Sequence, residues 1–179
     1  MSRIALVVLC SAVVAAGLPG DMSLGAWASA PASPAGYKLQ ESIRVPVLGA
    51  AGVSSRRPLL AGTLYVVRVT GTLYVGVGAL GPGFGDAEYA YYASGQFIDK
   101  CRDGTDLGVA IDDPNVMPGH VKKPHWGAYR QSHVYGARLR GSGERIVVDY
   151  HDCNYADNKP SVRTPGTGPL TVWLYAPVG

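Results

Sequence analysis

Short runs of alternating apolar and polar residues, separated by glycine and proline, follow one another through the chain after about residue 35. The clearest run covers residues 63–70, where Tyr65, Val67 and Val69 fall on one side of an extended backbone. Valine, tyrosine and threonine favour such pleated, half-buried surfaces. No window shows the three-and-four spacing of a long amphipathic helix. The pattern therefore predicts antiparallel β structure.

Further strands are expected at residues 37–47, 72–77, 89–92, 107–111, 133–139, 144–150 and 170–175. Residues 78–85, Gly-Ala-Leu-Gly-Pro-Gly-Phe-Gly, are expected to form a loop because glycine and proline disfavour regular structure. Residues 112–130 form a long irregular stretch, and loops of that length are usually functional or disordered. About eight strands predict an all-β fold, a two-sheet antiparallel β-sandwich.

The first residues have the three-part plan of a secretory signal peptide. Arg3 supplies a positive charge, residues 4–18 form an uncharged apolar run, and small and polar residues follow. Ala28-Ser29-Ala30 predicts cleavage after Ala30, and small residues two and four positions earlier leave an earlier cut open. The apolar run is shorter than the roughly 20 residues that span a bilayer. We therefore expect residues 1–30 to be removed and residues 31–179 to form one secreted or periplasmic domain without a membrane span.

Removal of the signal changes how the three cysteines are interpreted. Cys10 leaves with the signal, so Cys101 and Cys153 remain as a pair. In an oxidising compartment, and without metal ligands nearby, such a pair is expected to form a disulfide. The bridge would close a loop of about fifty residues and stabilise the fold by about 4 kcal/mol. Two free buried thiols are the alternative.

The formal net charge of +3 is spread thinly along the chain. Pairs such as Arg56-Arg57 and Lys122-Lys123 occur, but no run of five or six basic residues accompanies them. Because no nucleic-acid motif is present either, nucleic acid is not an expected partner.

The densest polar cluster is residues 151–158, His-Asp-Cys-Asn-Tyr-Ala-Asp-Asn, directly after a well-patterned strand. Carboxylates and carboxamides are the hard oxygen ligands that calcium takes, and a partner from elsewhere would have to complete the shell. Turn formation is the alternative, since Asp and Asn stabilise turns without a ligand. No Gly-x-Ser-x-Gly or His-Glu-x-x-His motif appears, so we predict that the protein is not an enzyme. A glycoside hydrolase is the remaining catalytic alternative, because its paired carboxylates can lie far apart in the sequence and leave no motif.

The C-terminal half combines a glycine turn at residues 141–143, a strand ending in Tyr150, Asp152, and the segment Tyr155-Ala156-Asp157-Asn158 before a last apolar strand. In this it resembles the bacterial PA-I type galactophilic lectins, which are small calcium-dependent β-sandwiches. The resemblance extends upstream to residues 62–76, where Tyr74 precedes Gly76 by two positions, and to residues 83–88, and it covers about residues 62–175. It implies a sandwich of jelly-roll or galactose-binding-like type.

The resemblance implies that Tyr74, through its carbonyl, and Asp152, Asp157 and Asn158 bind Ca²⁺, with sugar hydroxyls completing the shell. This chain departs from the family in three respects. The stretch after Asp152 is shorter and lacks a threonine ligand, Asp157 replaces an asparagine, and Lys159-Pro160 replaces small residues. An aspartate keeps an oxygen ligand, so metal binding is less affected than sugar binding.

Sugar binding also requires an aromatic face with polar groups at its rim. Tyr89 and Gln96 are the nearest counterparts of the family's sugar-contacting residues, and Trp126 is the candidate for an exposed ring in the long loop. Further candidates are Tyr91, Tyr92 and Tyr129, with His125 beside them; core packing is the alternative for all of these rings. We therefore predict a secreted, non-catalytic, calcium-binding sandwich with a carbohydrate or glycoconjugate as partner, for which homo-oligomer formation would add avidity. The alternative is an extracellular sandwich that serves stability or protein contacts.

Overall fold

A computed structural model describes residues 29–46, 52–78, 81–92, 94–102, 104, 106–112, 124–154, 156, 158 and 169–179. Its described elements are eleven strands, paired antiparallel in three sheets. In the part of the chain that is described, no helix is long and apolar enough to cross a membrane. The predicted signal peptide lies outside the described residues, except for Ser29 and Ala30.

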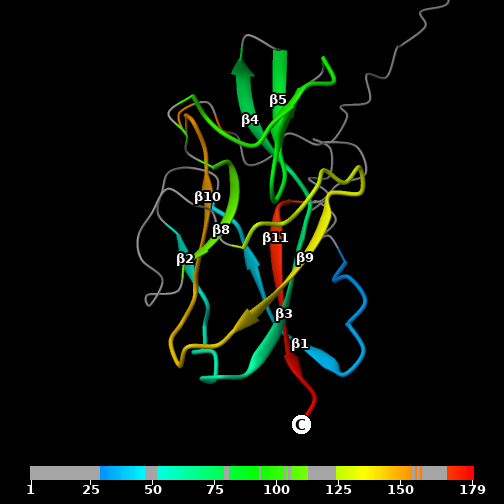
Figure 1. Cartoon of the computed structure of the whole chain (residues 1–179), viewed down its shortest axis with the longest axis vertical. Helices are drawn as coiled ribbons and strands as arrows, with labels where there is room; N and C mark the ends of the chain where they lie inside the picture. Colours follow the sequence, from blue (N-terminus) through cyan, green and yellow to red (C-terminus); the bar gives the residue numbers. More distant parts are fainter. Residues whose placement is uncertain are drawn as a thin grey trace, which may run out of the picture.

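The largest sheet has the order β1-β11-β3-β9 and occupies the lower half of Figure 1. Its strands are β1 (Tyr37–Arg44), β11 (Thr171–Pro177), β3 (Leu64–Thr70) and β9 (Val134–Arg140). In β3 every second residue is buried, as the alternation of residues 63–70 predicts. The buried face contributes to one apolar core that also includes Val148 and Tyr150.

Two smaller sheets complete the fold. One has the order β2-β10-β8, with β2 (Val53–Ser54), β10 (Val147–His151) and β8 (Gly108–Asp112). The other has the order β4-β5-β6-β7 and contains β4 (Leu73–Gly78), β5 (Gly81–Gly85), β6 (Ala90–Tyr92) and β7 (Phe97–Ile98). Strands β4 and β5 form the upper end of the molecule in Figure 1. The predicted all-β, sandwich-like fold is confirmed, although the strands form three sheets instead of two.

The glycine-rich residues 78–85 were expected to form a loop, and this prediction is wrong for the part that forms β5. The glycines allow close approach of neighbouring side chains. A Cβ atom on Gly85 would overlap the Tyr150 hydroxyl, and one on Gly83 would lie 2.8 Å from the Tyr92 ring. Glycine in a strand often marks such a close approach. The composition that argued against a strand is therefore what lets this strand lie against its neighbours.

The segment just after the predicted cleavage site lies on the outer face of the largest sheet. The Tyr175 hydroxyl donates to the Pro31 carbonyl, and Arg68 Nη1 donates to the Ala32 carbonyl, both at 2.7 Å. The Val178 amide donates to the Gly36 carbonyl at 2.9 Å. Cleavage after Ala30 would leave all of these contacts in the mature chain.

Candidate functional site

Four aromatic residues lie directly opposite one another across the sheet β4-β5-β6-β7. Tyr74 pairs with Phe84, Phe84 with Tyr91, and Tyr91 with Phe97. Directly opposed residues project from the same face of a sheet, so the four rings form one row. The ring centroids of Tyr74 and Phe84, and of Phe84 and Tyr91, are each 5.7 Å apart. We call these four residues the aromatic row.

Two further tyrosines extend the aromatic row. The Tyr129 ring stacks on Phe97 with centroids 5.2 Å apart and ring planes 10° from parallel. The Tyr89 ring meets both Phe97 and Tyr129 edge to face, at 5.6 and 6.0 Å. We call the aromatic row with Tyr89 and Tyr129 the aromatic face. Phe97 is 53% exposed, so one ring of the face is open to a ligand.

Beneath the aromatic face, the turn between β5 and β6 carries a fully buried carboxylate, Asp86. Its Oδ1 accepts hydrogen bonds from the backbone amides of Glu88 and Tyr89, both at 2.9 Å. Its Oδ2 accepts the Tyr135 hydroxyl at 2.8 Å and lies 2.9 Å from His133 Nδ1. Four hydrogen-bond partners compensate the desolvation of this carboxylate. Asp86 therefore holds the β5–β6 turn against the start of β9.

His133 links Asp86 to the aromatic row. The imidazole is 7% exposed and stacks on the Tyr91 ring with centroids 4.9 Å apart. Its backbone has φ of 49°, in the left-handed region that residues with a side chain rarely adopt. Such a conformation costs about 1–3 kcal/mol and persists only where surrounding contacts enforce it. The Asp86 carboxylate, the Tyr91 ring and the hydrogen bond from the His133 amide to the Arg130 carbonyl, at 2.9 Å, are contacts that hold it.

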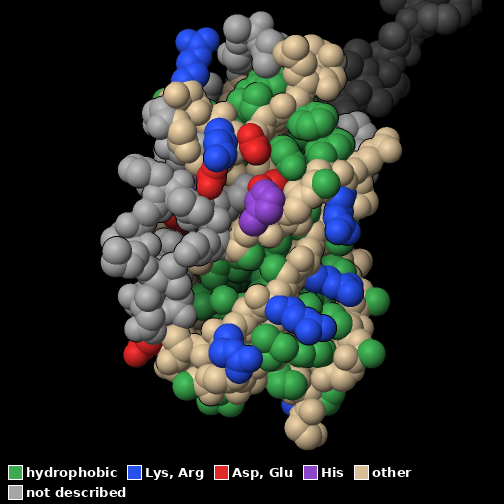
Figure 2. Space-filling view, in the orientation of Figure 1, with side chains coloured by type: hydrophobic (Ala, Val, Ile, Leu, Met, Phe, Trp, Pro, Cys, Tyr) green, Lys and Arg blue, Asp and Glu red, His purple; other side chains and the backbone are tan. Residues whose placement is uncertain are grey.

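A second buried carboxylate, Glu88, holds His125 and Trp126, two residues of the stretch 112–130 that was expected to be irregular. Its Oε2 accepts the Trp126 backbone amide at 2.7 Å, and its Oε1 lies 2.6 Å from His125 Nδ1. The Glu88 side chain is 2% exposed, whereas the His125 side chain is 72% exposed. A buried acid thus orients an imidazole that projects into solvent. Figure 2 shows acidic side chains and a histidine beside hydrophobic side chains on the upper half of this view.

Two tyrosine hydroxyls of the aromatic face, those of Tyr89 and Tyr129, have a raised pKa and stay protonated into alkaline conditions. Burial raises the pKa of Tyr89, and the charges of Glu88, Asp99 and Asp86 raise it further. Burial also raises the pKa of Tyr129, with a smaller contribution from Asp86. Both hydroxyls therefore remain able to donate a hydrogen bond at physiological pH.

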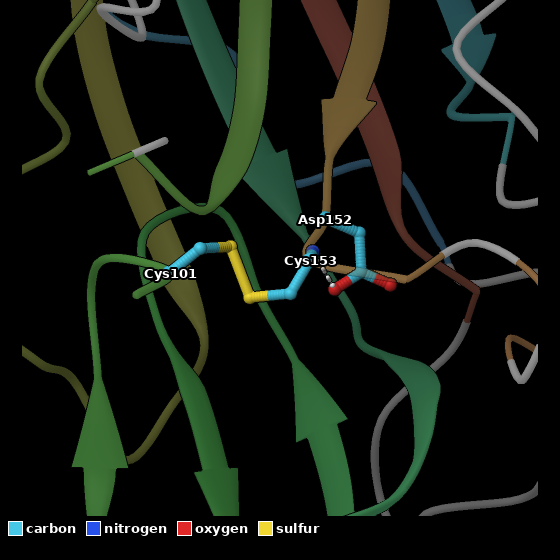
Figure 3. Close-up of a disulfide and its surroundings, with 3 residues drawn as sticks. All are labelled: Cys101, Asp152 and Cys153. Carbon is cyan, nitrogen blue, oxygen red and sulfur yellow. Dashed lines mark hydrogen bonds between the residues drawn. A yellow bond between two sulfur atoms is a disulfide. The ribbon is translucent and has the colours of Figure 1, made fainter. Parts of the chain in front are cut away.

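The predicted disulfide between Cys101 and Cys153 is confirmed, with Cα atoms 5.5 Å apart. Cys101 lies four residues after Phe97, and Cys153 directly follows Asp152, whose Oδ1 accepts the Cys153 amide at 2.7 Å. Figure 3 shows Asp152 beside the bridge. The disulfide therefore ties the loop after β10 covalently to the segment that follows β7, at the edge of the aromatic sheet.

The structure places part of the predicted calcium set. Tyr74 lies in the aromatic row, Asp152 adjoins the disulfide, and Asn158 is buried with 5% exposure, whereas Asp157 lies outside the described residues. Among the residues described, no three His, Cys, Asp or Glu side chains gather as a metal site. The predicted calcium ligands are two carboxylates, one backbone carbonyl and one carboxamide, a combination different from a cluster of three such side chains. The calcium site therefore stays a prediction.

The predicted sugar-contacting residues fall in different environments. Tyr89 belongs to the aromatic face, and Gln96 is exposed in the turn between β6 and β7, where its carbonyl accepts the Tyr92 amide at 2.8 Å. Trp126, in contrast, is only 3% exposed, and its indole N–H donates to the Val109 carbonyl at 2.8 Å. An exposed ring was expected, but Trp126 is a core residue. Glu88 accepts its backbone N–H, and the Val109 carbonyl accepts its indole N–H.

Sequence reasoning missed Asp86, Glu88, Phe84 and Phe97. A weak signal existed in the two acids spaced by one residue within an otherwise apolar segment, a spacing that puts both on one side of an extended chain. Comparison of the chain with protein-family models, curated protein sequences and solved structures finds no match.

Proposed function

We propose that this protein is an exported, non-catalytic carbohydrate-binding domain whose ligand lies against the aromatic face. The observation that carries the proposal is the aromatic row, aligned across four strands and open to solvent at Phe97. Aromatic rings offer a flat apolar surface for the C–H face of a sugar, and tyrosine adds a polar edge. The hydroxyls of Tyr89 and Tyr129, the Gln96 amide and the exposed His125 ring supply the polar rim.

The two buried carboxylates support a binding role over a catalytic one. A general acid or base must come within hydrogen-bond reach of the substrate. Asp86 is fully buried with both oxygens engaged by protein groups, and Glu88 holds Trp126 and His125. In this proposal the two acids keep the aromatic face rigid, and the sugar meets the rings.

Calcium is the second component of the proposal. Asp152 and Asn158 would supply oxygen ligands of the kind that calcium takes, and the disulfide ties the residue after Asp152 to the segment that follows β7. Tyr74, in the aromatic row, would supply its carbonyl, and Asp157 would supply a second carboxylate. A cation there would orient sugar hydroxyls, while the rings exclude water from the opposite side of the sugar.

The sugar site is tested by measuring galactoside binding to the mature domain on a glycan array and by calorimetry. Replacing Phe97 with alanine removes the exposed ring, and we expect affinity to fall about tenfold, the equivalent of about 1.4 kcal/mol. Tyr37→Ala, in β1 on another sheet, is the matched control and should leave affinity unchanged. Absence of binding to every glycan, or equal affinity in both variants, would refute the sugar site and favour a scaffold for protein contacts.

The metal component has its own test. Calcium should raise the melting temperature of the wild type, and EDTA should reverse the increase, because a ligand that binds only the folded state stabilises it. Asp152→Ala should abolish the response, whereas Asp99→Ala, at an exposed acid of the same region, should keep it. A melting temperature that ignores both calcium and EDTA would remove calcium from the proposal and leave the aromatic site in place.

A further inference from the structure

The outer face of the largest sheet carries arginines on neighbouring strands. Arg68 of β3 lies opposite Gly136 of β9, and Arg138 lies two residues further along β9, followed by Arg140. Alternate residues of a strand share a face, so all three project outward, while Tyr65, Val67 and Val69 face the core. Figure 2 shows Lys and Arg side chains in an oblique row along the course of β9 in Figure 1.

Among the residues that the structure describes, no acidic side chain forms an ion pair with these three arginines. Arg68 and Arg140 each donate from Nη1 to a backbone carbonyl, Ala32 and Gly62 respectively, at 2.7 Å. A guanidinium has five N–H donors, so one bond to a neutral carbonyl leaves both its charge and most of its donors for an anion.

The missing side chain of Gly136 leaves an open space between two of the cations, here called the depression. A Cβ atom on Gly136 would have the Val67 carbonyl oxygen, at 3.7 Å, as its sole neighbour within 4 Å. Arg68 lies directly across from the depression, and Arg138 lies about 7 Å along the strand. The missing side chain therefore gives an anionic group access to two guanidinium groups at once.

We propose that this surface binds an anionic polysaccharide. A sulfate or carboxylate group sits over Gly136 between Arg68 and Arg138, and a neighbouring anionic group of the same polymer meets Arg140. Guanidinium groups bind such oxyanions through paired hydrogen bonds. The surface is separate from the aromatic face and goes beyond the neutral-sugar binding proposed above.

The chemistry of the surface favours a polysaccharide over a nucleic acid. Proteins that bind DNA neutralise about 6–10 phosphates, whereas three arginines define this surface. The outward side chains beside them on β3 and β9, Leu64, Val66 and Val134, are aliphatic. The two rings that β11 adds to this face, Trp173 and Tyr175, are only 7% and 0% exposed, so a base cannot stack on them.

The probes are heparin, as a sulfated polysaccharide, and uncharged dextran, with binding to the full mature chain measured at several salt concentrations. We expect the wild type to bind heparin and not dextran. Arg138→Gln should lower the affinity and reduce the slope of log K against log salt by about one. Arg145→Gln removes the same charge from an exposed arginine outside this face and should leave the slope unchanged. Gly136→Val fills the depression without changing charge, and we expect at least a several-fold loss of affinity with an unchanged melting temperature.

Three results would overturn the proposal. The first is no heparin binding by the wild type, and the second is an equal loss in Arg138→Gln and Arg145→Gln, which would show that only net charge matters. The third is tighter binding of DNA or of anionic phospholipid vesicles than of heparin at the same salt. Retention of galactoside binding by Arg138→Gln would show that this surface binds its ligand independently of the aromatic face.

Discussion

The two four-stranded sheets are stabilised in different ways. The sheet β1-β11-β3-β9 has strands of seven or eight residues, and a continuous apolar face holds it to the core. The sheet β4-β5-β6-β7 includes strands of only three and two residues, and much of its stabilisation comes from Asp86, Glu88, a glycine contact and the nearby disulfide. A short sheet that keeps one face partly open buries too little apolar area to be stable through packing alone. Directional bonds therefore add to the packing of Leu73 and Ala87 in the core and help to keep the rings in fixed positions.

Removal of the disulfide is expected to have the largest effect on stability and to affect the two sheets differently. Replacing Cys101 and Cys153 with alanine releases a crosslink between positions 52 residues apart and should lower the free energy of unfolding by about 4 kcal/mol. Urea denaturation measures this loss, and hydrogen exchange locates it. Amides of β6 and β7 should lose protection before those of β3 and β11. Equal loss of protection in both sheets would contradict the division.

Replacement of Asp86 tests whether its hydrogen bonds anchor the sheet β4-β5-β6-β7. Asp86→Ala leaves His133 and the Tyr135 hydroxyl without their buried acceptor, and we expect a loss of about 3 kcal/mol in the free energy of unfolding. Asp99→Ala, at an exposed acid, should change it by no more than about 0.5 kcal/mol. If the two variants unfold at the same urea concentration, the network around Asp86 does not anchor the sheet.

Two glycines offer a matched comparison between the sheets. Gly85→Ala should cost about 2 kcal/mol, because the new methyl group meets the Tyr150 hydroxyl. Gly136→Ala, on the largest sheet, has space for its methyl group and should be neutral or slightly stabilising. Thermal and urea unfolding measure both effects. Adding Tyr150→Phe should restore part of the stability lost in Gly85→Ala, and failure of that rescue would mean that the clash lies elsewhere.

Alkaline pH is expected to have the smallest effect. Burial and the nearby Asp86 charge raise the pKa of Tyr135 above the ordinary value of 10.0. The unfolded chain therefore releases this proton first, so stability present below about pH 10 is lost as the pH rises further. Tyr135→Phe should be less stable at pH 8 by about 1 kcal/mol and should lose less stability above pH 10. Urea midpoints between pH 8 and 11 measure this, with Tyr37→Phe as the control; parallel curves for wild type and Tyr135→Phe would contradict it.

The sequence predicted those features that depend on neighbouring residues. Alternation located β3 and β10 to within a few residues, and counting cysteines after removal of the signal paired Cys101 with Cys153. It failed at β5, where glycine and proline were interpreted as a loop, because the Tyr150 side chain that requires Gly85 lies on a distant strand. It also misplaced Trp126, since a proline- and glycine-rich context suggested exposure and said nothing of Glu88 and Val109.

The sequence by itself therefore determined that this chain is an all-β protein with one disulfide, because strand periodicity and cysteine parity are local or countable properties. Only the tertiary structure determined the candidate site. The aromatic row exists because four strands pair in one register, and a shift of a single residue in any strand would turn its ring to the other face. Asp86 and His133 are 47 residues apart, and only the packing of the β5–β6 turn against the start of β9 brings them together.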